Sequence, residues 1–535
     1  MERTERATRR RLMTLLAVVA CAGLLAAGCS SDDGDEGAEP GSSTSVASQD
    51  FDPDGIVRVG YDIRQQSGGG FFFDPTKMVS SVHQGWIALM YGTLLRPALD
   101  GPPVPDLAES TEIPDPNTIN ITLREGLTFS DGTPYDAEAV AAGLLRSKAA
   151  DNQAAFTAGF FDLQTATVTS PTTLTLKIKD GKAPGWHDQY LAGFQSAIVK
   201  PGQTDFSSGT IGAGPLKVTS YRPDQSVSFV RNDSYWDAES VQIGGVEIVQ
   251  VATDQPQTGT AALQADQIDL VLTSIEQIPA LTGDLELFTQ ADPNQNVQMY
   301  MCKKDGPLAD ERVRLAINKA VDRDALGEAV FAGTTEPAHG LWPDDHRFHN
   351  PDINDVLAYD EDEARSLLAE AGYADGFSID MYMTQGVSIP EAAEVIQQDL
   401  AKLNIKANLI QPANFVADFL DPPRPGMALI PGNAAGRDKL NAFSGAGLGN
   451  VCDWDDPALN ALITKLAGVS ASSDEAVDLW HEIEAKVVNE ALSGLYLFRS
   501  RIAGYNAEHL NTVALYPLGT VIVPDVFNIE VSPES

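Results

Sequence analysis

Apolar and polar residues alternate along three stretches in the first third of the chain, at Ile56–Tyr61, Thr118–Leu123 and Thr173–Ile178. Alternation with a period of two places successive side chains on opposite faces of a strand, so each stretch predicts a β-strand. Between the second and third, Asp136 precedes an apolar face that predicts a helix to about Arg146. Because strands and helices mix from the start, the pattern favours an α/β fold over a bundle or a sandwich.

Helical patterns dominate the second half of the chain. Asp310 precedes one that runs to about Arg323, and its three arginines are expected to pair with nearby acids. Asp360 and Glu363 have the spacing of a capping box, and Gly372 ends that helix. Other helices are predicted to begin at Pro390, Asp456 and Asp474, with a strand at Lys406–Ile410. These elements show no fixed sequence period, which excludes a solenoid.

The N-terminal region has the pattern of an export signal. Several arginines precede an uncharged run of 17 residues, Leu12–Gly28, which is short for a membrane span. Small residues lead into Cys29, and this junction is similar to a lipobox. We predict a lipoprotein signal peptide at 1–28, lipidation of Cys29 and anchoring to the outer face of the cell membrane; an ordinary secretory signal or an uncleaved anchor is the alternative. Residues 29–52 lack an apolar period and predict a flexible acidic tether.

Composition narrows the function. The chain has 535 residues, of which 43% are hydrophobic and 21% charged, so it has enough apolar surface for extended cores. This length implies two to four domains or one large two-lobed body. With 36 Lys and Arg against 75 Asp and Glu, the formal charge is −39, and such a chain would repel phosphate backbones. Nucleic-acid binding is therefore excluded as an expected function.

Two cysteines remain in the body of the chain, Cys302 and Cys452. In an exported protein such a pair favours a disulfide. The two positions are 150 residues apart, and closing a loop of that length would stabilise the fold by roughly 4 to 5 kcal/mol in the chain-entropy model. The alternative is two separate buried thiols.

Catalytic motifs are absent from the sequence. It contains no Gly-x-Ser-x-Gly elbow, no Ser-x-x-Lys and no P-loop. His481–Ala485 begins like a zincin helix, but Ala485 stands where the second imidazole is needed. We interpret that segment as a surface helix, and His346 and His349 as solvated loop residues rather than metal ligands. The sequence therefore predicts a protein that is not an enzyme and that has no metal and no cofactor.

Five motifs follow one another from about residue 90 to 470: Leu123–Pro134, Gly212–Leu216, Arg231–Trp236, Asp310–Arg323 and Tyr359–Tyr373. The first is similar to "LR-x-G-x-x-F-x-D-G-x-P" and the third to "R-N-x-x-Y-W". In this order they resemble the extracellular solute-binding family 5, the oligopeptide- and dipeptide-binding lipoproteins of bacterial ABC importers.

The resemblance implies a two-lobed α/β fold of the periplasmic-binding-protein type (type II, cluster C). Lobe one would span 53–300 with an inserted subdomain at about 93–205, lobe two 301–495, and 496–535 would return to lobe one. The first hinge crossing would be Met301–Lys303 and the second would lie near 494–500. On this layout Cys302 is at the hinge and Cys452 is on lobe two, close to where some family members carry a disulfide.

The resemblance also implies a function. The chain would be a monomer that captures a solute, most often a peptide, between its lobes and delivers it to the permease of an ABC transporter. An oligosaccharide or a metal chelate is an alternative solute. An exported hydrolase or peptidase with an unrecognised active site, or a structural lipoprotein without a ligand, is an alternative function.

Five residues are candidate ligand contacts. Asp438, with Arg437 beside it, matches the segment in which peptide-binding members place an aspartate against the ligand's α-amino group. Tyr61 stands at a strand end, Phe72 lies in a glycine-rich aromatic loop, and Trp454 is close to Cys452. Ligand clefts often combine aromatic walls with a few polar anchors. For each residue the alternative is a packing or solvated side chain.

Overall fold

The computed structural model covers most of the chain beyond the N-terminal region. It describes residues 51–63, 73–77, 84–98, 102–148, 160–252, 256–290, 295–302, 306–384, 388–412, 426–433, 439–440, 442–444, 450, 452, 454–517 and 522–533. The predicted signal peptide, tether and lipidation site Cys29 lie outside these residues. In the described part of the chain, no helix combines the length and apolar character that a membrane-spanning segment needs.

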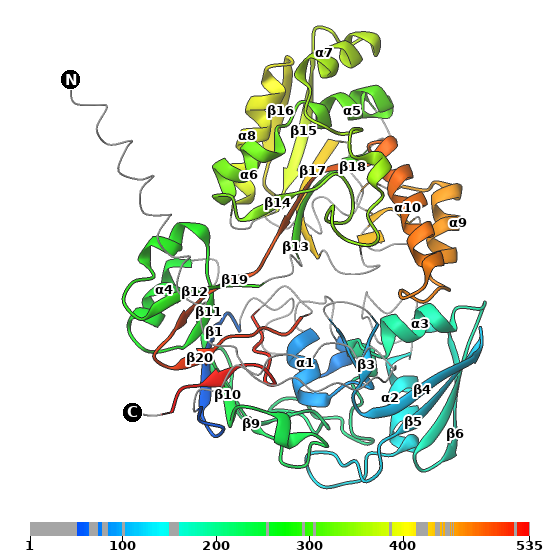
Figure 1. Cartoon of the computed structure of the whole chain (residues 1–535), viewed down its shortest axis with the longest axis vertical. Helices are drawn as coiled ribbons and strands as arrows, with labels where there is room; N and C mark the ends of the chain where they lie inside the picture. The colour runs from blue at the N-terminus through cyan, green and yellow to red at the C-terminus, as the bar shows by residue number, and fades with distance from the viewer. Residues whose placement is uncertain are drawn as a thin grey trace, which may run out of the picture. The chain divides into compact units, whose positions relative to one another are not determined.

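Two large sheets organise the body (Figure 1). The first has the order β12 (Leu285–Thr289), β19 (Ile502–Asn506), β11 (Leu270–Leu272), β1 (Ile56–Tyr61), β10 (Gly245–Gln250), β9 (Ser226–Arg231) and β8 (Leu216–Arg222). The second has the order β14 (Thr335–Pro337), β18 (Ser493–Arg499), β13 (Gln295–Cys302), β17 (Gly426–Asn433), β15 (Phe377–Met383) and β16 (Ile405–Ile410). We call the parts built on these sheets lobe one and lobe two.

A separate four-stranded antiparallel sheet falls inside the range predicted as an inserted subdomain. Its order is β4 (Ala108–Asp115), β5 (Thr118–Leu123), β7 (Thr173–Ile178) and β6 (Leu163–Ser170). The helices with lobe one are α1 (Gln84–Tyr91), α2 (Ala137–Ser147), α3 (Ala183–Tyr190) and α4 (Pro256–Gln264). Those of lobe two are α5 (Glu311–Lys319), α6 (Arg323–Phe331), α7 (Glu361–Glu370), α8 (Ile389–Ala401), α9 (Pro457–Leu466) and α10 (Asp474–Asn489). The predicted α/β class is confirmed.

The chain passes between the large sheets twice, as predicted, but the first crossing lies elsewhere. Met301 and Cys302 pair with β17 inside the second sheet, so a crossing at Met301–Lys303 and a lobe boundary after residue 300 are wrong. The passage falls between Thr289, the last residue of β12, and Gln295, the first residue of β13. The return falls between Arg499 of β18 and Ile502 of β19, a few residues after the predicted boundary at 496. Strand pairing fixes these points, and a single sequence does not reveal it.

Side-chain caps explain where the helices begin. Asp360 accepts a hydrogen bond from the backbone N–H of Glu363 at 2.8 Å, as the capping box predicts. The Glu363 carboxylate does not return the bond but pairs with Lys319 Nζ at 3.0 Å. The single helix predicted after Asp310 is wrong, because Asp322 accepts from the N–H of Ala325 and starts a second helix.

The three arginines expected to form ion pairs there behave differently. Arg312 does pair with Asp310, at 2.6 Å. Arg314 and Arg323 instead donate to the backbone oxygens of Glu490 and Leu357. The prediction of ion pairs is therefore wrong for these two, whose guanidinium groups link helices to loops within lobe two.

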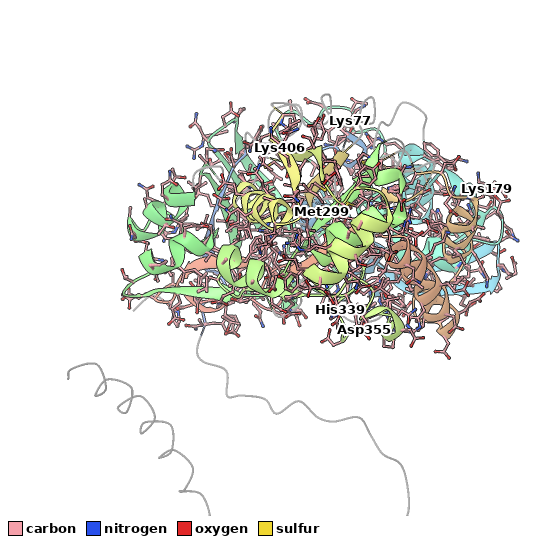
Figure 2. The ribbon with its side chains drawn as sticks, turned by 90° about the horizontal axis from the view of Figure 1, so that it is seen from above. Lys77, Lys179, Met299, His339, Asp355 and Lys406 are labelled. Atoms are coloured by element: carbon pink, nitrogen blue, oxygen red, sulfur yellow. A yellow bond between two sulfur atoms is a disulfide. The ribbon has the colours of Figure 1, made fainter. Side chains whose placement is uncertain are left out.

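Each lobe has its own apolar core. One cluster of buried side chains fills most of lobe one and the four-stranded sheet, a smaller one lies around α4 and β11 of lobe one, and two others fill lobe two. Met299 of β13 is fully buried and lies well inside the ribbon in Figure 2, whereas Lys179 is drawn at the margin. Burial of separate cores lets each lobe keep its structure when the lobes move as bodies.

Two of the recognised motifs meet at a buried carboxylate that the sequence did not single out. Asp106 accepts from the hydroxyl of Tyr235 at 2.6 Å and from the indole N–H of Trp236 at 2.9 Å. Arg124 donates to the Asp106 backbone oxygen, and its guanidinium lies 3.5 Å from the centre of the Trp236 ring. Burial raises the pKa of Asp106. These motif residues thus hold lobe one together.

Candidate functional site at the carboxyl ends of the parallel strands

The first candidate edge lies at the carboxyl end of β1. β10 and β11 flank β1 on its two sides, and both run parallel to it. Since α4 joins β10 to β11 across β1, the strand order changes direction at this point. Ligands of open α/β sheets bind outside the carboxyl ends of the strands at such a switch point. Tyr61, a predicted contact, is the last residue of β1.

Polar side chains cover this edge. Gln250, the last residue of β10, donates from Nε2 to Asp62 Oδ1 at 2.8 Å and accepts from the N–H of Ile63 at 2.8 Å. The Tyr61 ring is buried, with its centre 6.4 Å from that of Trp86. Asp62 and Gln250 are not among the contacts predicted from the sequence, although Asp62 directly follows β1 and Gln250 ends β10. The edge combines an aromatic wall with a carboxylate and an amide, which are binding groups.

Lobe two repeats the arrangement around β15. β16 and β17 flank β15 and run parallel to it, and α8 joins β15 to β16. The chain then returns from β16 to β17 on the other side of β15, so the carboxyl end of β15, at Met383, is a second switch point. One switch point in each lobe is the arrangement that a ligand gripped from two sides requires.

The two crossings lie beside each other. The backbone N–H of Gln290 donates to the oxygen of Arg501 at 3.0 Å, and Arg501 Nε donates to Gln290 Oε1 at 2.7 Å. Nη2 of the same Arg501 guanidinium donates to the backbone oxygen of Tyr516. Burial lowers the pKa of Arg501 to about 10. This pairing couples the two passages into one hinge.

Cys302 and Cys452 form the disulfide that the sequence favoured. Both residues lie in one core cluster of lobe two, so the bond links two parts of that lobe and does not join the lobes. Trp454 is fully buried in the same cluster, and its backbone N–H donates to Asn450 Oδ1 at 2.8 Å. It is a core side chain here, and a ligand contact for it stays a prediction. The candidate contacts Phe72, Arg437 and Asp438 lie outside the described residues.

The interpretation of His349 as solvated is wrong. Its side chain is 3% exposed, with Nε2 2.7 Å from Asn354 Oδ1 and Nδ1 3.4 Å from Glu484 Oε2. Glu484, from the segment interpreted as a surface helix, is fully buried and accepts from the N–H groups of Trp342 and Asn350. His346 stacks on Trp342 at 4.1 Å between ring centres. Tertiary packing around α10 buries these groups, and local sequence gave no sign of it.

One group of metal-ligating residues occurs among the described residues: Asp266, Asp269 and His509. Arg58 contacts all three, at 2.7 Å from Asp266, 2.5 Å from Asp269 and 2.9 Å from His509 Nδ1. The hydrogen bonds that Arg58 donates to Asp269, with the charges of Asp269 and Asp266, raise the pKa of Arg58. Because a guanidinium already neutralises these acids, the group is an ion-pair cluster rather than a vacant cation site.

A polar contact joins the lobes away from the hinge. Asp188 of α3 accepts at Oδ2 from Ser470 Oγ at 2.7 Å and from the N–H of Ala471 at 2.8 Å. Its Oδ1 lies 2.8 Å from His187 Nδ1, and His187 Nε2 lies 2.7 Å from Thr111 Oγ1 of β4. The order hydroxyl, imidazole, carboxylate is also that of a catalytic triad.

Known proteins resemble this chain in sequence and in fold. The glutathione-binding protein GsiB of Salmonella paratyphi A is 28% identical over 314 residues, covering 57% of this chain and 60% of GsiB. Heme-binding protein A of Haemophilus influenzae is 28% identical over 322 residues, covering 56% of this chain and 57% of that protein. The matched segment therefore spans about three fifths of the length of these relatives.

Solved structures match over most of the chain. NikA from Brucella suis in complex with Fe(III)-EDTA has a TM-score of 0.77 at 22% identity and covers 90% of this chain and 100% of its own. The dipeptide-binding protein from Pseudoalteromonas sp. SM9913 in complex with Met-Leu has a TM-score of 0.73 at 18% identity, with coverage of 90% and 100%. These neighbours confirm the two-lobed periplasmic-binding-protein fold.

The family model of the bacterial extracellular solute-binding proteins, family 5 Middle, matches residues 102–434, more than half of the chain. This match covers all five motifs and most of the residues that build lobe two. The chain therefore belongs to the bacterial extracellular solute-binding proteins of family 5.

Proposed function

We propose that the chain is the substrate-binding component of an ABC importer, which captures a solute between its lobes and delivers it to a membrane permease. The observation that supports this proposal is the family match over 102–434 on a body with one strand switch point in each lobe. The chain would work outside the cytoplasm as a monomer anchored through lipidated Cys29.

Capture would follow from differential affinity. A solute that contacts Asp62 and Gln250 on one edge and the end of β15 on the other gains both sets of contacts only when the lobes are closed. Binding therefore shifts the population toward the closed form, and opening at the permease releases the solute. The paired crossings at Gln290 and Arg501 provide the axis. No covalent step is required.

A peptide is the solute class we favour. The neighbour crystallised with Met-Leu holds a dipeptide, and the relative GsiB is named for glutathione, which is itself a tripeptide. Asp438, as a lobe-two partner for an α-amino group, belongs to this proposal. Other relatives and neighbours are named for heme or nickel chelates, which makes these the competing solutes.

Native mass spectrometry of protein purified without refolding tests the proposal, because a retained solute would appear as added mass. Titration with glutathione, Met-Leu, heme and Ni(L-His)2 then follows the melting temperature. A true ligand at 100 times its dissociation constant stabilises by about 2.7 kcal/mol. Asp62→Asn should weaken that effect, whereas Asp180→Asn, at an exposed position of lobe one, should not. No retained mass and no response to any probe would contradict the proposal.

The hydrolase alternative has one supporting observation, the Thr111, His187 and Asp188 chain. A peptidase using it would lose turnover in Thr111→Val, since the hydroxyl would be its nucleophile. Two observations count against a triad. Asp188 Oδ2 accepts hydrogen bonds from two donors of lobe two, and Thr111 lies within a strand of the four-stranded sheet. Peptide cleavage by the purified protein that disappears in Thr111→Val would favour the hydrolase.

A further inference from the structure

Asp188 holds together two segments that belong to different lobes. α3 lies in the part of lobe one that carries the four-stranded sheet, whereas Ser470 and Ala471 lie in the connection between α9 and α10 of lobe two. Figure 1 shows this connection reaching α3. The backbones also come close, since a Cβ built on Gly468 would lie 3.4 Å from the oxygen of Gly181. The contact is separate from the two crossings.

The lobe-one half of the contact is fixed before the lobes meet. The rings of Trp186 and Tyr190 on α3 pack against Phe160, with centres 5.1 and 5.6 Å from it. His187 holds one Asp188 oxygen and is itself held by Thr111. The Asp188 side chain is 11% exposed. Its second oxygen is therefore positioned for partners without further ordering.

The lobe-two half is fixed as well. Ser473 accepts at Oγ from the N–H of Ala476 and caps α10, and its own hydroxyl donates to the Ser470 backbone oxygen at 2.8 Å. Arg347 donates to the Ser473 oxygen at 3.3 Å from another loop of the same lobe. Two preordered halves lose little conformational entropy when they join, which favours a stable contact.

Electrostatics agrees with this geometry. Burial alone would raise the pKa of Asp188, but hydrogen bonds from His187, Ser470 and Ala471 outweigh it and hold the pKa below its usual value. The carboxylate is therefore stabilised in its charged form where it meets lobe two. Hydrogen bonds to a charged acceptor are the strong ones.

A second contact between the lobes lies elsewhere and provides an independent readout. The 3-10 helix Ile275–Ala280 follows β11 of lobe one, and Ile275 packs against a core cluster of lobe two. Ser388, at the start of α8, lies with Oγ 3.5 Å from Glu276 Oε1. Any opening that separates the lobes at Asp188 should also disturb this contact.

We propose that Asp188 and the Ser470–Ala471 segment form a clasp that stabilises the closed arrangement of the lobes. Opening breaks the two bonds to Asp188 Oδ2, while the bonds within each lobe remain. The clasp therefore adds a solute-independent preference for closure and sets how much of the closed form exists before any solute binds. This inference rests on the two-lobed capture proposed above and adds a residue pair that controls it.

Hydrogen–deuterium exchange of the full-length, solute-free protein tests the clasp. In Asp188→Asn and Ser470→Ala, exchange should rise about tenfold in peptides covering 467–473, 275–280 and 388–393, the scale expected for losing a charge-assisted hydrogen bond. Asp180→Asn and Ser472→Ala are matched controls. Asp180 is exposed in the same part of lobe one, and the Ser472 hydroxyl contacts Ser470 within its own loop.

The pattern of exchange across these peptides decides whether Asp188 and Ser470–Ala471 form a clasp. Faster exchange at 275–280 and 388–393 in both clasp variants, with neither control changed, supports the clasp. A change confined to 467–473, or equal effects of Asp188→Asn and Asp180→Asn, overturns it. If Asp188→Asn also accelerates exchange in β1 and β15, the variant unfolds, and Ser470→Ala decides alone. Since no solute is present, a failed clasp and a failed solute-binding proposal give separate results.

Discussion

Asp106 and Asp188 are buried carboxylates with similar donors around them, but their partners come from different places. Asp106 is 2% exposed and accepts from Tyr235, Trp236 and the N–H of Thr93, all in lobe one. Asp188 accepts from His187 in its own lobe and from Ser470 and Ala471 in the other.

This difference determines which equilibrium each group controls. Asp106 loses its partners when lobe one unfolds, so its hydrogen bonds contribute to the free energy of unfolding. Asp188 loses two partners when the lobes separate, with both lobes still folded, so its bonds contribute to the free energy of closure. Contacts of the same chemistry thus divide into those that make the fold and those that select one arrangement of it.

The disulfide belongs to the contacts that make the fold, here in lobe two. Its removal should lower the free energy of unfolding more than any other change considered. Replacing Cys302 and Cys452 by Ser removes a loop constraint over 150 residues, which in the chain-entropy model costs roughly 4 to 5 kcal/mol of unfolding free energy. Urea denaturation measures the loss. A reductant should reproduce it in the wild type and leave the double variant unchanged. Because the bond lies within lobe two, hydrogen–deuterium exchange at 467–473 should stay at the wild-type level. A rise there would mean that the disulfide also controls the contact between the lobes.

Asp106→Ala should give the next largest effect. The Tyr235 hydroxyl and the Trp236 N–H would be left in a buried site without their acceptor, which costs about 3 kcal/mol for two such donors. Urea denaturation should show that loss, with Asp180→Asn within about 0.5 kcal/mol of the wild type as the exposed control. A loss below about 1 kcal/mol would mean that water replaces the carboxylate.

Local patterns predicted the elements of the fold because alternation and capping act over a few residues. Ile56–Tyr61 is a strand, and Asp136, Asp360 and Asp456 cap helices, as the sequence indicates. The break at Asp322 was missed because a capping aspartate within an apolar period resembles any exposed helix residue.

The contacts that could not be predicted from the sequence are those between residues far apart along the chain. Ser470 lies 282 residues from Asp188, and neither residue stands in a motif. The burial of Glu484 depends on the loop that carries Trp342 and Asn350, which no periodicity in α10 records. The candidate edge at Asp62 could have been predicted, because a polar residue directly after a predicted strand of an α/β fold is a signal of its own.

Replacing His349 should lower the free energy of unfolding by less than Asp106→Ala does, and by an amount that depends on pH. Burial alone would lower its pKa, but the hydrogen bond and charge of Glu484, with Asn354 and Asp344 nearby, raise the pKa above its usual value. The folded protein therefore binds this proton more tightly than the unfolded chain, and the stabilisation is full below about pH 6.5 and disappears as pH rises through the folded pKa.

The wild type should accordingly exceed His349→Gln by about 1 kcal/mol at pH 6 and by less at pH 9. Urea denaturation at both pH values measures this difference. His339→Gln, at a more exposed histidine beside Asp344, is the control. A gap between wild type and His349→Gln that grows toward pH 9 would show that His349 is neutral in the folded protein.

Asp188→Asn should change the free energy of unfolding least, by under about 1 kcal/mol, although the same variant is expected to change interlobe exchange about tenfold. The reason is that the variant can open and remain folded, with residue 188 solvated and His187 still held by Thr111. Urea denaturation and exchange on one sample compare the two quantities directly. An unfolding loss as large as that of Asp106→Ala would place Asp188 among the contacts that make the fold, since opening of the lobes breaks only its bonds to Ser470 and Ala471.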